Sequence, residues 1–366
     1  MSAPRYTPTA QAVQDRITSY ADTFGPLLRS YLIQLGEAFD HPAESAFTPN
    51  ALSLVSDLAL AGGKRQRAAF VYEAARLPGT EAVAGAADIG ALAIELLQTA
   101  LLIHDDLVDN SSTRRGIRST FGSYTAQMPA HPQYAMGMTV MAGDLASYLA
   151  ADVIAASDLP ADLALAMTRV ILRAGKETYC GQMIDLERDF TALPDLAFLD
   201  TVSDYKSGRY SIIAPIQLGL LAAGHDPAPH HDTLHRYSRA VGILGQIRDD
   251  YISFFGDPKV TGKPDSVDAR AGRLSYPLRE ALAAATIREK HHMRTVLGRT
   301  DATDADIDMV RDIAYTHGVD ETLRTMMGQR AQQARDEAAT WHLLGWDPDA
   351  VGFFAESTLW GAERAS

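Results

Sequence analysis

The chain has 366 residues, of which 46% are hydrophobic and 22% are charged, an ordinary composition for a globular protein. Its formal net charge of −13 argues against nucleic-acid binding, which needs a basic surface. The single cysteine excludes an intrachain disulfide and a zinc site built from cysteines. It also fits a reducing compartment, so we expect a cytoplasmic protein.

The N-terminus, MSAPRYTPTAQ, has no apolar stretch of the kind found in secretory signals. We expect residues 1–10, which include Pro4 and Pro8, to form a flexible tail. No apolar run of about 18 residues is apparent, so we expect no membrane span. No long linker interrupts the chain, and residues 11–366 are expected to form a single domain.

Apolar residues recur at helical spacing through most of the chain. The first predicted helix spans residues 10–39, with a bend near Pro26, and the second spans residues 51–61, with Asn50 as its cap. Further helices are expected at residues 82–109, 134–156, 162–186, 196–224, 233–255, 276–299, 304–316, 320–344 and 348–364. Residues 110–120, 224–232 and 256–266 are expected to be loops. Because no stretch alternates with a period of two, we predict an all-α fold.

An acidic motif stands at the end of the apolar helix expected at residues 82–109. The stretch LLIHDDLVDNSSTRRG (101–116) carries Asp105, Asp106 and Asp109, which share one face of a helix. Like charges at this spacing destabilise a helix unless a cation neutralises them, and aspartate oxygens suit magnesium. Taken alone, the motif also fits a solvated acidic helix end.

A second acidic motif, GQIRDDYISFFGD (245–257), echoes the first. Gln246, Asp249, Asp250 and Ser253 share one helix face. Two acidic helix ends in one bundle can face each other across a cavity and hold several magnesium ions between them. Both motifs are followed by cationic residues, Arg114 and Arg115 after the first, Lys259 and Lys263 after the second.

These motifs, in this order and spacing, resemble those of the trans-isoprenyl diphosphate synthases, the polyprenyl synthetase family. The resemblance covers residues 62–277 and rests on GGKRQR (62–67), IELLQTALLIHDDLVDNSSTRRG (94–116), AGD (142–144), GQMIDL (181–186), YKSGRY (205–210), GQIRDDYISFFGD (245–257) and TGKP (261–264). It implies an all-α bundle of the isoprenoid synthase type around a deep central cavity, and usually a homodimer.

The resemblance implies a magnesium-dependent, head-to-tail (1′–4) condensation. Isopentenyl diphosphate would react with an allylic diphosphate (dimethylallyl, geranyl or farnesyl) to give a longer trans-prenyl diphosphate. Three magnesium ions per active site are expected, with manganese as an alternative. Metal ions and cationic side chains would stabilise the charge that develops on the leaving diphosphate, in a pocket that excludes water. No serine or cysteine nucleophile is required.

The resemblance also assigns residues. Magnesium would bind on one side to Asp105, Asp106 and Asp109 and on the other to Asp249 and Asp250. The allylic diphosphate would contact Arg114, Lys206, Gln246 and Lys263. The isopentenyl diphosphate would contact Lys64, Arg67, Gln98 and Arg115, with glutamine 98 standing where many members have histidine. Gln182 and Asp185 are expected to orient the residues that contact the metal and the diphosphates, without touching either themselves. Asp250 is expected to share this orienting role. Lys64, Arg65 and Arg67 taken alone would equally fit a solvated helix start.

Side chains just before the first acidic motif set the product length in this family. Here they are Leu97, Ala100 and Leu101. Because alanine at position 100 leaves room for a longer chain, we predict a product beyond C15, most like the C20 product of geranylgeranyl diphosphate synthases. Leu97 or the helix around residues 136–141 is expected to form the pocket floor.

The sequence departs from the family pattern at Ser253, which stands at the third acidic place of the second motif. The segment AGRLSY (271–276) matches only loosely, so Arg273 is left out of the predicted site. Two alternatives remain. A class I terpene cyclase shares the bundle but needs no second anion site. A non-catalytic subunit of a heteromeric prenyl synthase usually loses acidic motifs, which this chain keeps.

Overall fold

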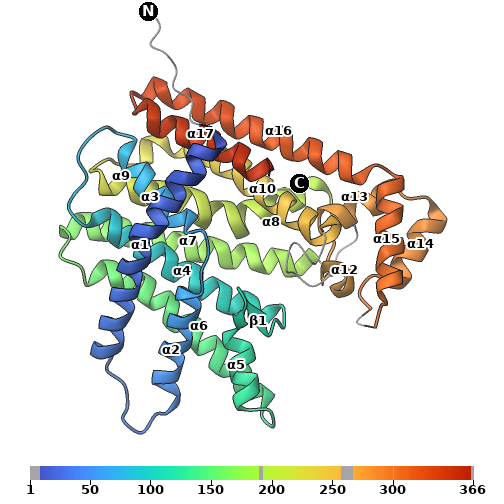
Figure 1. The fold of residues 1–366 in the computed structure, drawn as a ribbon, viewed down its shortest axis with the longest axis horizontal. Helices are drawn as coiled ribbons and strands as arrows, with labels where there is room; N and C mark the ends of the chain where they lie inside the picture. The colour runs from blue at the N-terminus through green and yellow to red at the C-terminus, as the bar shows by residue number, and fades with distance from the viewer. Residues whose placement is uncertain (1–8, 189–192, 257–266, 300, 364–366) are drawn as a thin grey trace, which may run out of the picture. The chain divides into compact units, whose positions relative to one another are not determined.

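The computed structural model of the protein describes residues 9–188, 193–256, 267–299 and 301–363, which are almost entirely helical (Figure 1). The all-α prediction is confirmed. Within these ranges the strands are β1 (Thr113–Arg114) and β2 (Ile117–Arg118), which pair antiparallel as a small hairpin. Residues 110–120 were expected to be a plain loop, so the hairpin corrects that prediction.

Backbone contacts divide the chain into two compact units, which are described separately. The first unit contains residues 12–175 and 214–229, and the second contains residues 1–11, 176–213 and 230–366. The expectation of a single domain over residues 11–366 stays a prediction. So does the flexible tail, because residues 1–8 lie outside the described residues and the first helix already begins at Ala10.

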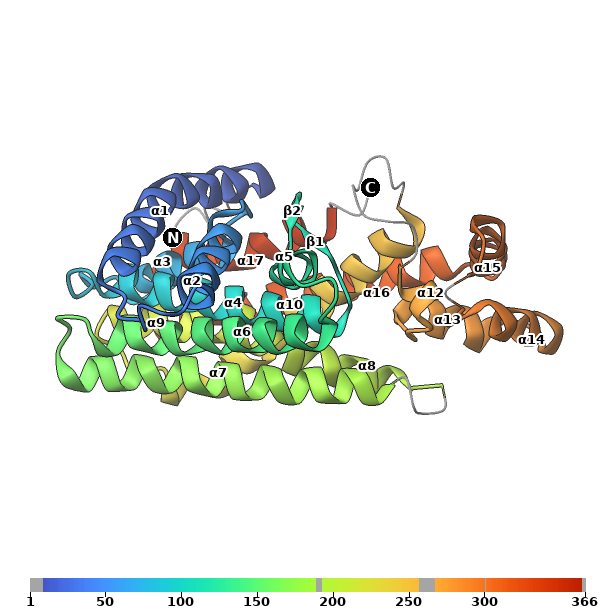
Figure 2. The same cartoon turned by 90° about the horizontal axis from the view of Figure 1, so that it is seen from below.

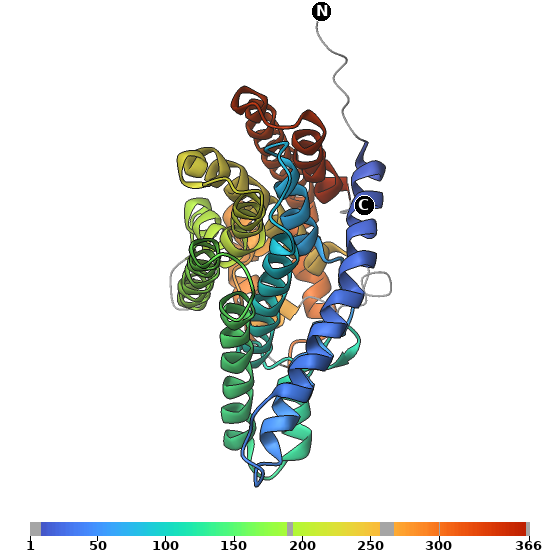
Figure 3. The same ribbon diagram turned by 90° about the vertical axis from the view of Figure 1, so that its left-hand side faces the viewer.

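The first unit is built around α4 (Ala86–Val108), which packs against α6 (Pro132–Ala155), α3 (Gln66–Arg76) and α9 (Ala214–Ala222) (Figures 2 and 3). Its other helices are α1 (Ala10–Ala38), α2 (Phe47–Leu60), α5 (Thr120–Gln127) and the first part of α7 (Ala161–Glu187). Small residues allow the close packing. A Cβ on Gly219 would lie 2.4 Å from the carbonyl oxygen of Val71, so α9 can approach α3 only with glycine there.

Some helix boundaries of this unit differ from the predictions. The helices α3 and α5 were not predicted. Helix α2 begins at Phe47, so the prediction that Asn50 caps it is wrong. The hydroxyl of Ser45 accepts the backbone N–H of Thr48 (3.1 Å) and so satisfies the start of the helix earlier in the chain.

The second unit contains α10 (His231–Phe255), which packs against α16 (Val319–Ala339) and against the π-helix η2 (Asp204–Ile213). The remaining elements are α8 (Leu196–Ser203), α12 (Val267–Ala271), α13 (Tyr276–Ala284), α14 (Ile287–Val296), α15 (Asp304–Thr316), the 3-10 helix η4 (Thr340–Leu344) and α17 (Pro348–Glu363). The short 3-10 helix η3 (Ala228–His230) lies between α9 and α10 in the chain. Apolar residues of α10, α13, α15 and α16 form the core of this unit.

Two predicted helices of the second half are interrupted. Residues 196–224 form α8, η2 and α9 instead of one helix. A Cβ on Gly242 of α10 would lie 2.6 Å from the Cα of Gly208, and Ser238 donates its hydroxyl to the Gly208 carbonyl (2.8 Å), so contact with α10 accompanies the widened turn. Residues 276–299 break at Ala285, because Thr286 and Glu289 form a capping box that starts α14.

We expected no membrane span, yet α4 and α6 are long and apolar enough to cross a membrane by length and composition alone. The apolar window of α4 is 72% buried inside the protein, which is the behaviour of a core helix. The corresponding window of α6 is 44% buried, so this helix keeps an exposed apolar face.

Candidate functional site

The first acidic motif lies at the C-terminal end of α4, as predicted. Asp105 and Asp106 occupy its last turn and Asp109 is the residue that ends it. The β-hairpin then folds Arg114 back onto this end. Arg114 donates from Nε to Asp106 Oδ1 (2.7 Å) and from Nη2 to Asp105 Oδ2 (2.9 Å). One guanidinium therefore neutralises part of the carboxylate cluster.

Asp106 is fully buried, and burial raises the pKa of its carboxyl to about 6, although Arg114 opposes the shift. Its Oδ2 atom is also buried and accepts no hydrogen bond from the described residues. Burying an anionic oxygen without a hydrogen-bond partner costs free energy, so this atom is well placed to bind a cation.

The residues at this end fit magnesium better than a metal held by protein alone. Within the described ranges, no three histidine, cysteine or acidic side chains are grouped so that they could hold a metal ion. Magnesium usually binds one or two carboxylates and completes its shell with water and substrate phosphates. Asp105 and Asp106, which share Arg114, would supply the carboxylate oxygens in that way, and Asp109 as a further ligand stays a prediction.

His104, near the C-terminal end of α4, packs against α6. A Cβ on Gly143 would lie 2.3 Å from His104 Nε2, so the AGD motif provides the space that this ring needs. His104 Nε2 lies 3.4 Å from Asp144 Oδ1 and 3.3 Å from the Val140 carbonyl oxygen. This contact fixes the residue next to Asp105 in place.

A cationic cluster is built from the GGKRQR segment and the hairpin. Gly62 and Gly63 have positive φ angles of 77° and 108°, which glycine adopts at low cost. Arg115 donates from Nη1 to the Gly62 carbonyl (3.0 Å), and a Cβ on Gly63 would lie 3.2 Å from the carbon of its guanidinium. The glycines therefore let Arg115 lie against the backbone of the segment that carries Lys64 and Arg67.

Arg65 holds this segment to its neighbours. Its backbone is left-handed (φ 51°), and it directly precedes α3. Its guanidinium donates to Glu95 Oε2 of α4 (2.8 Å) and to the Ala59 carbonyl (2.6 Å), and both charged side chains are buried. Arg67 then lies in the first turn of α3, where a helix N-terminus favours anions.

The electrostatics of this cluster favour an anion. Desolvation by the surrounding protein lowers the pKa of Arg115, and the charges of Arg65, Arg67 and Arg114 lower it further, while Glu95 opposes them. Arg65 and Arg114 are paired with carboxylates, so the excess of positive charge in this cluster comes from Arg115 and Arg67. A diphosphate would relieve their mutual repulsion.

The second acidic motif lies in α10 of the second unit. Asp249 is exposed, with Arg248 Nη2 at 3.2 Å from its Oδ1. Asp250 is only 6% exposed, and both its oxygens accept hydrogen bonds. Gln246 donates from Nε2 to Oδ1 (2.7 Å), and the backbone N–H of Tyr276 donates to Oδ2 (3.1 Å).

A cavity of about 60 Å³ lies beside Asp250 in the same unit. Lys206 of the π-helix lines this cavity. Gly181 of α7 permits the close approach of the π-helix, since a Cβ there would lie 2.4 Å from the backbone nitrogen of Lys206. The Lys206 ammonium donates to Asp185 Oδ2 (2.7 Å), and Arg188 Nη2 lies 3.1 Å from Asp185 Oδ1. Burial alone would raise the pKa of Asp185, but the charges of Lys206, Arg188 and Arg273 hold it below its usual value.

The described residues bring some of the predicted groups together, namely Asp105, Asp106 and Arg114 in the first unit and those beside Asp250 in the second. Lys206, Gln246, Asp250 and Asp185 line one cavity. Gln182 lies half-buried on α7 near Asp185. Lys259 and Lys263 lie outside the described residues, so their predicted roles stay predictions. That the two acidic motifs share one diphosphate also stays a prediction.

Four residues that the sequence analysis left out belong to these surroundings. Arg273, Arg188 and Tyr276 line the cavity, and Arg65 anchors the cationic segment. Arg273 was omitted because its segment matches the family pattern only loosely. For Arg65 a signal was present, because Glu95 is a lone charge inside an apolar helix and needs a buried partner.

The three residues predicted to set product length are all buried in α4. Ala100 lies in an apolar cluster with Tyr124 of α5 and Val55 of α2, and Met138 of α6 packs against that cluster. Leu97 points elsewhere, since its Cδ1 lies 3.4 Å from the position of a Cβ on Gly175.

The sequence of this chain is similar to those of known prenyl diphosphate synthases. The family model described as polyprenyl synthetase matches residues 49–314. A farnesyl diphosphate synthase from Escherichia coli (strain K12) is 29% identical over 226 residues, covering 60% of this chain and 71% of that protein. A geranylfarnesyl diphosphate synthase from Aeropyrum pernix is 33% identical over 249 residues, covering 67% and 74% respectively.

A similar fold occurs in a solved structure, the geranylgeranyl pyrophosphate synthase from Corynebacterium glutamicum, complexed with isoprenyl diphosphate and magnesium. The TM-score is 0.83 at 25% identity, and the match covers 94% of this chain and 99% of that one. The three named proteins differ in the product that their names give.

Proposed function

We propose that the product of this chain is C20 geranylgeranyl diphosphate. The premise is that the chain belongs to the polyprenyl synthetase family. It is thus a prenyltransferase of isoprenoid biosynthesis that makes trans-prenyl diphosphates. The substrates would be isopentenyl diphosphate and an allylic diphosphate, with magnesium as the metal. Three ions per active site and manganese as a substitute belong to the same proposal.

One observation carries the assignment of the two substrates and the metal. A single helix, α4, ends in carboxylates that need a cation, and the hairpin that follows it places Arg115 in a cluster that needs an anion. Two sites of opposite preference in one unit suit a metal-bound diphosphate beside a metal-free one. A terpene cyclase has no use for the second site.

The chemistry assigns distinct work to these groups. Bound magnesium would supply Lewis-acid stabilisation of the leaving diphosphate. Arg114 and Lys206 would add positive charge there as the C1–O bond of the allylic substrate breaks. Lys64, Arg67, Gln98 and Arg115 would hold isopentenyl diphosphate so that its C4 bonds to that C1. The proton lost from C2 would pass to the released diphosphate.

The direct test uses the purified protein with magnesium, isopentenyl diphosphate and each allylic primer in turn. We expect mass spectrometry to show C20 geranylgeranyl diphosphate as the main product from farnesyl diphosphate. A C15 or C25 end product would contradict the length assignment alone. Hydrocarbon released from a single prenyl diphosphate would favour the cyclase, and no product at all would favour the non-catalytic subunit.

The product length is predicted to depend on Ala100. In the Ala100→Phe variant the ring would occupy the cluster with Tyr124 and Val55, so we expect the main product to shorten from C20 to C15. Product analysis by mass spectrometry measures this, and Ala100→Leu should give an intermediate mixture.

Overpacking alone must be separated from this effect. Ala91 is equally buried in α4 but lies on the opposite helix face, so Ala91→Phe serves as the matched control. The control should lower the melting temperature and leave the product at C20. An unchanged product in Ala100→Phe would mean that the pocket floor lies elsewhere.

We further propose a homodimer in the cytoplasm. Tyr134, Met141 and Tyr148 recur every seven residues on α6 and are 68%, 60% and 77% exposed, respectively. An apolar stripe of this kind is typical of a helix that packs against another protein surface. A second copy of the chain is the partner that fits the family.

A further inference from the structure

The carboxylate of Asp250 owes its orientation partly to the start of α13. Tyr276 is the first residue of this helix, and Ser275 before it makes no capping hydrogen bond with its own side chain. Asp250 of α10 accepts the Tyr276 N–H instead (3.1 Å) and so acts as the cap from another helix. A displacement of the α13 start would therefore release one oxygen of Asp250.

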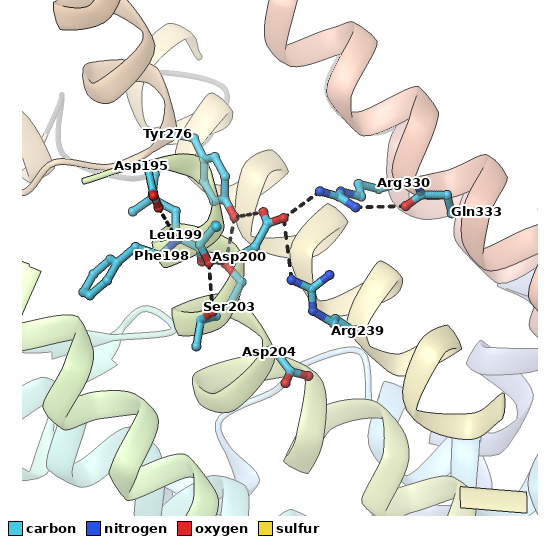
Figure 4. Close-up of polar contacts among 12 residues, drawn as sticks. Asp195, Phe198, Leu199, Asp200, Ser203, Asp204, Arg239, Tyr276, Arg330 and Gln333 are labelled. Atoms are coloured by element: carbon cyan, nitrogen blue, oxygen red, sulfur yellow. Dashed lines mark hydrogen bonds and ion pairs between the residues drawn. The ribbon is translucent and has the colours of Figure 1, made fainter. Parts of the chain in front are cut away.

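The side chain of Tyr276 fixes that helix start. It is 1% exposed, and its hydroxyl donates to Oδ1 of Asp200 in α8 (2.9 Å; Figure 4). Burial and the charge of Asp200 raise the pKa of Tyr276 well above its usual value, so the hydroxyl keeps the proton that it donates.

Asp200 is in turn held from two further helices. Its side chain is buried, and its Oδ2 lies 2.6 Å from Arg330 Nη2 of α16 and 3.8 Å from Arg239 Nη2 of α10 (Figure 4). The other terminal nitrogen of Arg330, Nη1, donates a hydrogen bond to Gln333 Oε1 (2.9 Å), which fixes the guanidinium. Removing one of these partners would leave the buried carboxylate with fewer hydrogen bonds and would displace it toward the partners that remain.

We propose that Arg330, Asp200 and Tyr276 form a positioning chain that holds the Asp250 carboxylate in the geometry for binding magnesium diphosphate. None of the three touches substrate or metal in this assignment, and Arg330 and Asp200 lie outside every motif quoted above. The inference rests on the proposed function, because it assigns Asp250 to the diphosphate. Groups that orient metal ligands in this way typically change metal affinity 10- to 100-fold when removed.

The test uses the full chain and two readouts. The first is the magnesium concentration that gives half-maximal turnover. The second is the rise in melting temperature on adding magnesium with inorganic pyrophosphate, which needs no turnover. In Tyr276→Phe, which keeps the ring, and in Arg330→Gln, we expect the half-maximal magnesium concentration to rise about tenfold and the temperature rise to shrink. Arg330→Lys should restore part of the effect.

The matched control is Arg335→Gln. Arg335 lies on the same helix and pairs with the buried Glu356 (2.6 Å), and neither residue belongs to the chain of contacts that leads from Arg330 to Asp250. It should lower the melting temperature and leave the magnesium dependence unchanged. Wild-type magnesium dependence in both Tyr276→Phe and Arg330→Gln would overturn the proposal, whatever their stability. A wild-type protein that is stabilised by magnesium pyrophosphate but makes no prenyl product would contradict only the proposed function.

Discussion

Replacing Asp106 by asparagine is expected to lower kcat by about a thousandfold. The change keeps the shape of the side chain and removes the charge of a buried carboxylate, the proposed metal ligand, whose Oδ2 accepts no hydrogen bond from the described residues. Loss of metal-based stabilisation costs several kcal/mol, and about 4 kcal/mol corresponds to a thousandfold in rate. Steady-state kinetics with excess magnesium would measure the effect, and added metal should not restore the rate.

The same variant should not lose stability without ligand. Burial raises the pKa of Asp106 to about 6 from an ordinary value of 3.8, so the folded protein disfavours the charged form. The contribution of this group to the free energy of unfolding is fully present below pH 3.8 and is lost as the pH rises through about 6. At pH 7 the ligand-free Asp106→Asn protein should therefore melt no lower than the wild type.

A control on the same helix separates the metal role from helix effects. Asp88 lies in the first turn of α4 and accepts the hydroxyl of Tyr72 (2.7 Å), far along the helix from the acidic end. Asp88→Asn should leave kcat nearly unchanged. A kcat within threefold of wild type in Asp106→Asn would remove Asp106 from the metal site.

Replacing Arg115 by glutamine is expected to raise the KM for isopentenyl diphosphate about 30- to 100-fold and to change kcat little. A hydrogen bond to a charged group contributes about 1.5–3 kcal/mol, and each 1.4 kcal/mol is tenfold in affinity. Arg115 lies against Gly62 and Gly63 in the cationic cluster, so its loss removes charge from that site alone. Kinetics with each substrate varied in turn would measure both constants.

Arg118 provides the control for this variant, because it is exposed in β2 of the same hairpin. Arg118→Gln should leave both KM values unchanged. If Arg115→Gln instead raised the KM for the allylic substrate, Arg115 would belong to the other diphosphate. That result would exchange the roles predicted for Arg114 and Arg115.

The positions of the acidic motifs followed from local rules. Apolar spacing predicted a buried helix ending near Asp109, and the structure ends α4 at Val108 with Asp109 as its cap. Helix geometry then requires that Asp105, Asp106 and Asp109 gather at one helix end. Glycine at positions 62 and 63 is likewise typical of a turn, and both residues have positive φ angles before the basic residues.

Contacts between distant segments could not be read in the same way. The π-helix around Lys206 accompanies contact with Gly181 and Ser238, which lie in other helices. Arg273 was discounted by its local sequence, yet it lines the cavity beside Asp250. The partners of a buried charge depend on packing over the whole unit, and no local pattern encodes them.

The sequence by itself determined the all-α class and the family, and it supplied the residues predicted to bind a metal and two diphosphates. These properties depend on helical periodicity and on short motifs, which are local. Only the tertiary structure decided that Arg114 bridges Asp105 and Asp106, that Arg65 is anchored to Glu95, and that Asp250 caps α13. Each of these contacts joins separate elements, so its geometry exists only once the helices have packed.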